Sequence, residues 1–205
     1  PTTELSSLSL HDALPILVAI GPLTNLAALL AEAPGLLKNI ARLTVMGGAV
    51  FAKGNVTPWA EFNFYRDPAA AAAVMGSGLP ITLAPLDLTR QVVFDESNLA
   101  RVAVADTPAG RFLSAVLPFS LASGCDVPAG RMLVHDALAV GCVLWPEMFI
   151  RTQLGLEIVL DGQSRGQSRP ALGDPDRRVS VLTAVDAVDF LENLQETLAG
   201  EHFVV

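Results

Sequence analysis

Two short apolar runs on either side of one amphipathic segment constrain the fold of this 205-residue chain most strongly. The runs, Leu17–Ile20 and Leu43–Met46, have the length and the side chains of buried strands. Gly21 and Pro22 mark the start of a helix between them, with Pro22 suited to the first helical position. One face of that helix carries apolar residues at the i, i+3, i+4 and i+7 spacing: Leu23, Leu26, Ala27 and Leu30. Strand, helix and strand in this order predict a βαβ unit with parallel strands and a right-handed crossover.

Further helix and strand signals extend this pattern along the chain. Asp67-Pro68 combines an N-cap acid with proline at the first helical position, which predicts a helix over Ala69–Met75. The expected elements that follow are a strand at Ile81–Leu86, with Asp87 and Thr89 at its C-terminal end, and helices at Asp95–Ala105, Pro108–Ala122 and Ala137–Leu144. The sequence therefore predicts an α/β fold with an open, mostly parallel, doubly wound sheet and helices on both faces.

The C-terminal segment has a different pattern of apolar and polar residues. Leu154–Leu160 and Arg177–Thr183 alternate apolar with polar residues across a polar connection, which predicts a finishing hairpin. Asp186 is expected to cap a last helix, with an apolar stripe made of Val188, Leu191, Leu194 and Leu198. No linker marks a second domain, so we expect one domain over residues 17–205.

The first sixteen residues fit this pattern poorly. They are rich in serine at the start and follow neither the helix nor the strand period, so we interpret residues 1–16 as an unstructured or foreign segment. We assign no function to His11 and Asp12, which lie within it.

Composition excludes several classes of partner. The chain is 51% hydrophobic and 17% charged, with a net charge of −8, so no basic stripe exists for nucleic acid and no polybasic patch for a membrane surface. No apolar run has the length of a membrane span. Cys125 and Cys142 lie in apolar contexts and are expected to be buried thiols of a reducing compartment, which predicts a cytoplasmic location.

The stretch Met46–Asn63 is the main candidate for a binding site. It follows a predicted strand, opens with two glycines, and carries three hydrogen-bonding side chains, namely Asn55, Glu61 and Asn63. Aromatic residues Trp59, Phe62 and Phe64 accompany them, so the set suits a neutral polyol such as a sugar, with the aromatic rings excluding water. The alternative is ordinary turn chemistry with solvated polar side chains.

His135 and Asp136 form the second candidate, at the start of an apolar helix. Histidine titrates near physiological pH and is a frequent acid or base, although an acid here is also a common helix cap. Asp136, the polar loop and the Gly-Pro turn after Ile20 are all expected at the carboxyl edge of one sheet, where open α/β sheets bind ligands.

These motifs together resemble the inosine-uridine nucleoside hydrolase family. The matching pieces, in order and rough spacing, are Val18–Ala27, Val45–Ala49, Gly54–Asn63, Asp67-Pro68 and His135-Asp136. Each piece is weak alone, but the combination is specific and covers the chain from about Leu17 to its C-terminus. The resemblance implies hydrolysis of the N-glycosidic bond of ribonucleosides with a bound Ca²⁺ ion, and a homodimer or homotetramer.

The resemblance also implies roles for individual residues. Asp136 and the backbone carbonyl of Ile20 would be calcium ligands, although the family usually has threonine at the second position. His135 would be a general acid near the leaving base, and Ala137 stands where the family often has proline. The substrate-binding set would be Met46, Asn55, Glu61, Phe62 and Asn63.

One family motif is absent from this sequence. The family carries an aspartate-rich loop, Asp-x-Asp-x-x-x-Asp-Asp, which supplies most calcium ligands and the catalytic base, and nothing like it occurs here. We therefore interpret the chain as an N-terminally truncated, C-terminal two-thirds of such an enzyme. We expect weak calcium binding, no turnover, an uncovered sheet edge and poor solubility.

Two other interpretations stay open at this point. One is a non-catalytic nucleoside- or ribose-binding module that lacks the acidic loop, and the other is a doubly wound protein whose loops only pack. A dinucleotide-binding enzyme is disfavoured, because no Gly-x-Gly-x-x-Gly follows a predicted strand.

Overall fold

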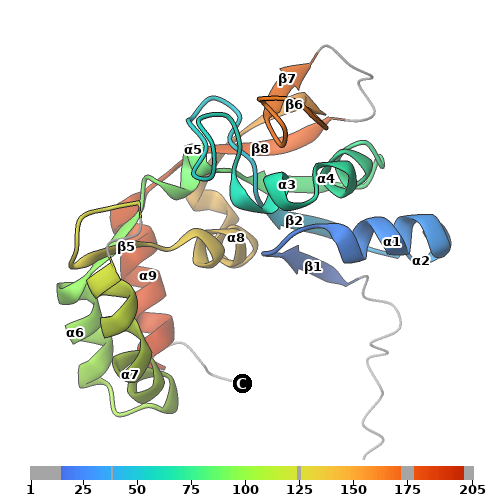
Figure 1. The fold of residues 1–205 in the computed structure, drawn as a ribbon. Coiled ribbons are helices and arrows are strands. Elements are labelled where there is room, and N and C mark those ends of the chain that lie inside the picture. Colours follow the sequence, from blue (N-terminus) through green and yellow to red (C-terminus); the bar gives the residue numbers. More distant parts are fainter. Residues whose placement is uncertain (1–14, 38, 124–125, 172–177, 201–205) are drawn as a thin grey trace, which may run out of the picture.

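A computed structural model describes residues 15–37, 39–123, 126–171 and 178–200. Its largest element is a six-stranded sheet, drawn across the upper half of Figure 1. The strand order is β1 (Ile16–Ala19), β2 (Arg42–Met46), β3 (Ile81–Ala84), β8 (Val179–Val185), β6 (Phe149–Ile158) and β7 (Ser168–Ala171). The first four strands are parallel, and β6 runs antiparallel to both β8 and β7. The prediction of an open, mostly parallel sheet is confirmed.

The βαβ unit at the start of the chain is also confirmed. β1 and β2 pair in parallel, with Leu17 opposite Leu43, and α1 (Thr24–Glu32) connects them together with the short α2 (Pro34–Leu37). The expected role of Pro22 was wrong, because the helix begins only at Thr24. Ile16 opens β1, whereas residues 1–14 lie outside the described residues.

Helices cover the two faces of the sheet, and strand alternation decides which residues meet them. Leu43 and Val45 of β2 point to one face, where α1 and α4 (Pro68–Met75) complete a core. Met46 points to the other face and joins a core with α8 (His135–Leu144) and α9 (Ala187–Ala199). Asp67 caps α4 by accepting a hydrogen bond from the backbone N–H of Ala70, as predicted.

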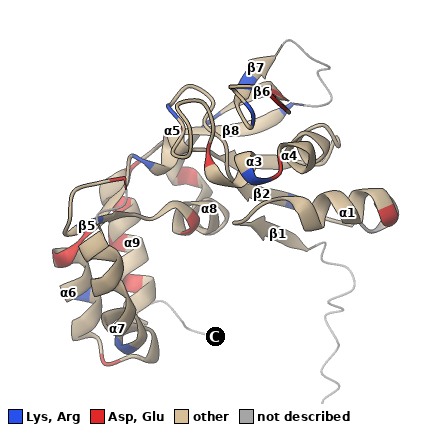
Figure 2. Cartoon of the chain, viewed as in Figure 1, with Lys and Arg blue, Asp and Glu red and all other residues tan. Residues whose placement is uncertain are grey.

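A separate lobe stands beside the sheet, at the left of Figure 1. It contains α6 (Glu96–Val104), α7 (Pro108–Ser123) and part of α9, joined by a two-stranded antiparallel sheet of β4 (Val93–Asp95) and β5 (Arg131–Leu133). Charged residues are scattered singly along α6, α7 and α9 in the view of Figure 2. The helices were predicted, but the small sheet was not.

Two boundary predictions were wrong in ways that matter for the site. β3 ends at Ala84, because a short helix, α5 (Leu86–Thr89), begins two residues later and includes Asp87 and Thr89. α8 begins at His135 and not at Ala137.

The C-terminal region was predicted in part. β6 and β8 do pair antiparallel, but β8 also belongs to the main sheet beside β3, β7 extends that sheet, and a 3₁₀ turn (Pro146–Met148) precedes β6. Asp186 caps α9 through the N–H groups of Val188 and Asp189. Val188 was wrongly placed in the apolar stripe: it is 67% exposed, and Phe190 is the buried anchor.

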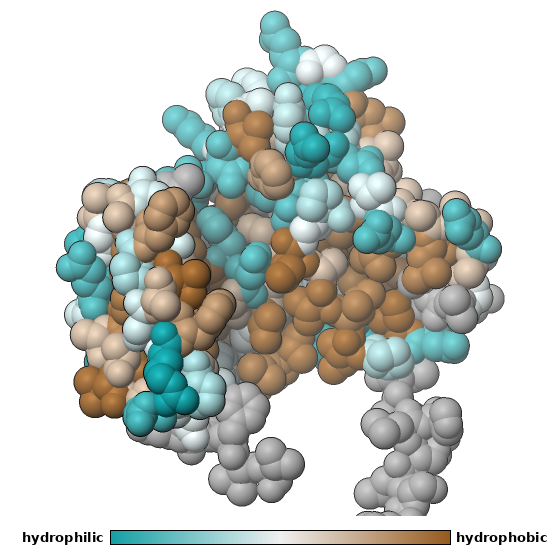
Figure 3. All heavy atoms as spheres, turned by 60° about the horizontal axis from the view of Figure 1, so that its bottom comes forward, coloured by the Kyte–Doolittle hydropathy of each residue, from teal (hydrophilic) through white to brown (hydrophobic). Residues whose placement is uncertain are grey.

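An apolar surface lies over β1 and α8. Within the described residues β1 pairs only with β2, and four large apolar side chains on these elements or directly after β1 are exposed: Ile16, Ile20, Val140 and Leu144. Figure 3 shows a broad brown area beside the α6–α7 lobe. Poor solubility of the chain therefore stays a prediction with a visible physical basis. Of the helices in the described ranges, none is long and apolar enough to cross a bilayer.

Candidate substrate pocket at the carboxyl edge of the sheet

A pocket of about 500 Å³ opens where β1 and β2 end and α8 begins. Every residue to which the family resemblance gave a role lines it, whereas the aromatic residues Trp59 and Phe64 do not: Trp59 is half-exposed and Phe64 lies in the core. The lining consists of Ile20, Met46, Asn55, Glu61, Phe62, Asn63, Met132, Leu133, Val134, His135, Asp136 and Ala137. The location follows from topology, because the carboxyl ends of parallel strands meet at one edge of the sheet.

Glu61 organises the floor of this pocket. It is the N-cap of α3 (Phe62–Arg66), and it is only 2% exposed. Its Oε1 accepts from the backbone N–H of Asn63 at 2.8 Å, and its Oε2 accepts from Gly48 at 2.9 Å and Phe64 at 3.2 Å. Burial raises the pKa of the Glu61 carboxyl, these backbone hydrogen bonds lower it in part, and the charge of Asp136 adds to the rise. The carboxyl group therefore has a structural task beside any contact with a ligand.

Asn63 joins the ends of the two strands. Its Nδ2 donates to the carbonyl of Met46 at 3.0 Å and to the carbonyl of Ile20 at 3.4 Å. Among the described residues its Oδ1 has no hydrogen-bond partner, so this oxygen is available to accept from a ligand hydroxyl. The amide thus fixes the pocket wall with one end and presents an acceptor with the other.

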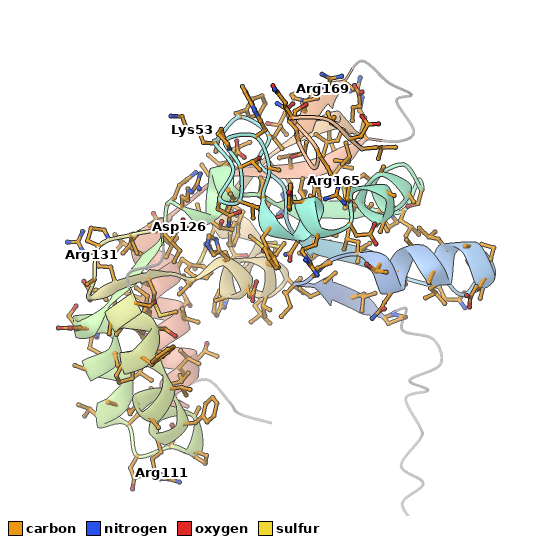
Figure 4. All side chains as sticks on the ribbon, in the orientation of Figure 1. Lys53, Arg111, Asp126, Arg131, Arg165 and Arg169 are labelled. Atoms are coloured by element: carbon orange, nitrogen blue, oxygen red, sulfur yellow. The ribbon has the colours of Figure 1, made fainter. Side chains whose placement is uncertain are left out.

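Asn55 comes from the long loop after β2. Its Oδ1 accepts from the backbone N–H of Phe62 at 3.0 Å, which leaves the amide group of the side chain to face the pocket. The loop itself is held from α5, the helix that the sequence did not predict. Figure 4 shows Lys53 of this loop above α5.

Two residues in or directly after α5 hold the loop that follows β2, and this role was not predicted from the sequence for either of them. The Asp87 carboxylate accepts from three successive backbone N–H groups, those of Val50, Phe51 and Ala52, at 2.7 to 2.9 Å. Arg90 donates to the carbonyls of Lys53 and Gly54. The sequence contains one indication of the role of Asp87, namely that this acid directly follows the end of a predicted strand.

His135 is held by a buried threonine. Its Nδ1 lies 2.7 Å from Oγ1 of Thr89, a residue of α5 with no exposed surface. Burial lowers the pKa of the His135 imidazole, the charge of Asp126 acts in the opposite direction, and Arg90 lowers the pKa further. Since Nδ1 is engaged by Thr89, the other ring nitrogen, Nε2, is the one available to a ligand.

We expect Thr89→Val to change the tautomer of His135. The Thr89 hydroxyl is buried and lies within hydrogen-bond distance of Nδ1, so this contact favours one neutral tautomer of the imidazole, whichever of the two groups donates. Valine has nearly the same shape but no hydroxyl, and two-bond ¹H–¹⁵N spectra should show that the preference is lost. Thr89→Ser should restore it. An unchanged spectrum in Thr89→Val would show that the hydroxyl does not set the tautomer.

Asp136 lies in the first turn of α8 with its carboxylate open to the pocket. Partial burial raises the pKa of this carboxyl group. No side-chain capping hydrogen bond is present at the start of α8, so Asp136 does not act as a helix cap. Its position suits a cation or a ligand hydroxyl better than a structural role.

The described residues do not form a calcium site by themselves. Calcium takes six to eight oxygen ligands. The pocket supplies one open carboxylate, on Asp136, and one candidate carbonyl, on Ile20, which already accepts from Asn63. In the described ranges no three His, Cys, Asp or Glu side chains are grouped as a metal site.

We expect Asp136→Asn to raise the free energy of unfolding at pH 7. A carboxyl whose pKa is raised in the folded state destabilises that state as the pH rises above the unfolded value, here 3.8. The gain should therefore disappear as the pH falls below that value. Urea unfolding at several pH values measures it, with Asp161→Asn, in the turn after β6, as the control. A gain that does not depend on pH would contradict the assignment.

The pocket continues toward α7. An adjoining hollow of about 310 Å³ shares Asn55, Met132, Leu133 and His135 with it, and adds Ser120, Ser123 and Asp126. Figure 4 shows Asp126 between the α6–α7 lobe and the body of the sheet. The site therefore has two connected compartments with His135 between them.

Fold and pocket define the class: an open α/β protein with a pocket lined by polar side chains at the carboxyl edge of its sheet. Residues 8–192 match the model of one family, the inosine-uridine preferring nucleoside hydrolases. The chain belongs to this family.

Relatives and solved structures agree with this assignment. The chain is 35% identical to pyrimidine-specific ribonucleoside hydrolase RihA of Shewanella woodyi, over 89% of this chain and 60% of that protein. It is 37% identical to RihB of Escherichia coli K12, over 69% of this chain and 45% of that protein. A purine-preferring ribonucleoside hydrolase from Gardnerella vaginalis superposes with a TM-score of 0.84 at 32% identity, covering 90% of this chain and 60% of that one. The chain thus spans about 60% or less of the length of these relatives.

Proposed function

We propose that the complete protein hydrolyses the N-glycosidic bond of ribonucleosides to give ribose and a free base. The observation that carries the proposal is that all the residues to which the family resemblance gave a role line one pocket, in a chain that belongs to the family. A ribose would lie against Met46 and Phe62, with its hydroxyls bonded to the amide of Asn55 and to Oδ1 of Asn63. Glu61 would hold both asparagines in place through α3.

His135 would assist departure of the base. In the reaction the C–N bond breaks, the base leaves with the bonding electrons, and the oxygen of water bonds to the sugar carbon. Nε2 of His135, between the two compartments, would donate a proton or a hydrogen bond to the base. The second compartment, beside α7, would receive the base.

Activation of the water needs groups beyond those described. A bound Ca²⁺ would supply a more acidic water and a grip on the sugar diol, and Asp136 with the Ile20 carbonyl would be two of its ligands. Since these two do not make a site alone, we expect further acidic ligands and a catalytic base from outside the described residues.

We expect the 205-residue chain to release no base from inosine or uridine, with or without calcium. The reason is that the described residues provide an incomplete set of oxygen ligands and no positioned base. Chromatography of the purified protein with each nucleoside measures release, and a complete family member serves as the positive control. Measurable release that disappears in Asp136→Ala would contradict this prediction.

The proposed function itself is tested on the protein encoded by the complete native gene. Reading that DNA upstream of the Leu17 codon shows whether an aspartate-rich segment is present. If it is, the expressed protein should cleave ribonucleosides, and Asn55→Ala and His135→Ala should reduce kcat/KM. If it is absent, a nucleoside-binding module without catalysis becomes the better proposal.

Several finer points belong to the same proposal. We propose that the protein functions in nucleoside catabolism in the cytoplasm. We further propose that it is a homodimer or homotetramer and has no nucleic acid or membrane partner. The relatives include pyrimidine-specific and purine-preferring enzymes, so the choice of base is left to the assay with both substrates.

A further inference from the structure

Another hollow, of about 240 Å³, lies away from both compartments of the substrate pocket, at the opposite edge of the sheet, where the parallel strands begin. It is separate from the substrate pocket and shares no residue with it. Its lining is polar and basic: Arg42, Pro80, Ile81, Thr82, Arg151, Gln153, Arg178 and Ser180. No carboxylate belongs to this described lining.

Strand register explains why these side chains meet. Thr82 of β3 is paired with Ser180 of β8, and Ser180 is paired with Gln153 of β6. Residues paired in this way point to the same face, so the three polar side chains form a row across three strands. The row lies on the face that α8 and α9 cover, because Leu182, two residues after Ser180, belongs to their core.

The arginines flank this row from both sides. Arg42 lies two residues before Thr44, which is paired with Thr82, and Arg178 lies two residues before Ser180, so both extend from the starting edge of the sheet. Arg151 comes from the other side of the row, beside Leu182, and donates to the carbonyl of Pro146 at 3.0 Å.

Among the described residues, no carboxylate forms an ion pair with the arginines of this cluster. The ion pairs of the described residues are Arg111–Asp106 and Arg169–Glu157, so none of the three pocket arginines takes part in one there. Two of the three arginines also act on Cys142 of α8: burial raises the pKa of its thiol, and the charges of Arg151 and Arg42 act in the opposite direction.

A buried hydroxyl in the same hollow lacks a partner. Oγ of Ser180 is fully covered, and it makes no hydrogen bond within the described structure. A buried polar group without a partner is unfavourable, and a ligand that accepts a hydrogen bond would satisfy it. The hollow therefore offers guanidinium groups and a hydroxyl donor together.

We propose that this hollow binds the phosphate group of a small molecule. Guanidinium groups match the geometry of phosphate oxygens and remain charged at any working pH, and the Ser180 hydroxyl adds a neutral donor. The chain carries a net charge of −8, and a site whose described lining holds three arginines and no carboxylate favours a dianion locally. The proposal does not depend on the proposed function, because the two sites lie at opposite edges of the sheet.

The test uses calorimetric titration of the 205-residue chain with inorganic phosphate and with ribose 5-phosphate, at constant ionic strength set by chloride. We expect saturable binding, weakened about tenfold in Arg42→Gln and in Arg178→Gln, since each loses a charge-assisted contact. Tighter binding of ribose 5-phosphate that Arg42→Gln and Arg178→Gln also weaken would identify a phosphorylated sugar as the ligand class of this hollow, and equal binding would identify phosphate itself.

Arg111→Gln is the matched control. Arg111 lies in the first turn of α7, at the bottom of the α6–α7 lobe in Figure 4, and forms an ion pair with Asp106. It does not line the hollow, so this variant should bind phosphate like the original chain. Absence of saturable binding, or binding that Arg42→Gln and Arg178→Gln leave unchanged, would overturn the proposal. Circular dichroism of each variant confirms that a loss of binding is not a loss of fold.

Discussion

Glu61→Ala is expected to lower the free energy of unfolding by about 2 kcal/mol. The Glu61 carboxyl accepts three backbone hydrogen bonds, from Gly48, Asn63 and Phe64, and alanine leaves all three donors without a partner. Each unsatisfied buried donor costs about 1 to 3 kcal/mol, and relief of the buried charge returns part of this sum. The variant should also lose affinity for ribose, because α3 carries Phe62 and Asn63 into the pocket.

Urea unfolding at pH 7 measures the first effect, and Glu61→Gln separates its causes. Glutamine keeps one acceptor oxygen but no charge, so its loss should be smaller than that of alanine. Glu96→Ala is the control, because Glu96 is an exposed glutamate in the first turn of α6. If Glu61→Ala were as stable as Glu96→Ala, the three hydrogen bonds would not hold the loop and α3 together.

The parts of the fold that sequence predicted are those with local causes. The parallel β1–β2 pair follows from apolar runs on either side of a helical stripe, and the caps of α4 and α9 follow from Asp67 and Asp186. In each case a few neighbouring residues contain the whole signal. The gathering of Asn55, Glu61 and His135 in one pocket followed from strand ends and from the family motif.

The parts that sequence missed depend on residues far apart in the chain. β4 and β5 are three residues each and are strands only because they pair with each other across α6 and α7. α5 was read as the end of β3, which hid Asp87 as the anchor of the loop and Thr89 as the partner of His135. No local pattern distinguishes an aspartate that accepts three distant N–H groups from a solvated one.

Glu61 shows the same limit within the site. The sequence placed it in the pocket, where it is, but its oxygens are engaged by the backbone and its side chain is almost wholly buried. Once α3 is known, Glu61 can be recognised as its N-cap, three residues before Phe64. From the sequence, the family motif suggested only a contact with a ligand.

Gly54→Ala is expected to be a highly disruptive single-methyl change in the loop that carries Asn55 into the substrate pocket. A Cβ at Gly54 would lie 2.2 Å from the carbonyl oxygen of Ala60, 2.3 Å from that of Thr57 and 2.4 Å from the Ala60 nitrogen. These are backbone atoms of the same tight loop, closed by hydrogen bonds from the N–H of Gly54 to Pro58 and from that of Asn55 to Ala60. Because no flexible side-chain tip can move aside, the loop must open, at a loss of about 3 kcal/mol.

Opening the loop has a consequence for binding that a general loss of stability does not have. Asn55 would lose its place beside Phe62, and Arg90 would lose the Gly54 carbonyl, so ribose affinity should fall even where the protein stays folded. Trp59, half-exposed in the same loop, reports the change by fluorescence quenching in a Trp145→Phe background. Gly21→Ala, whose Cβ would meet no atom within 4 Å, is the matched control. Unchanged Trp59 quenching in Gly54→Ala would mean that the loop tolerates a side chain there, and that Asn55 is positioned by something other than this tight turn.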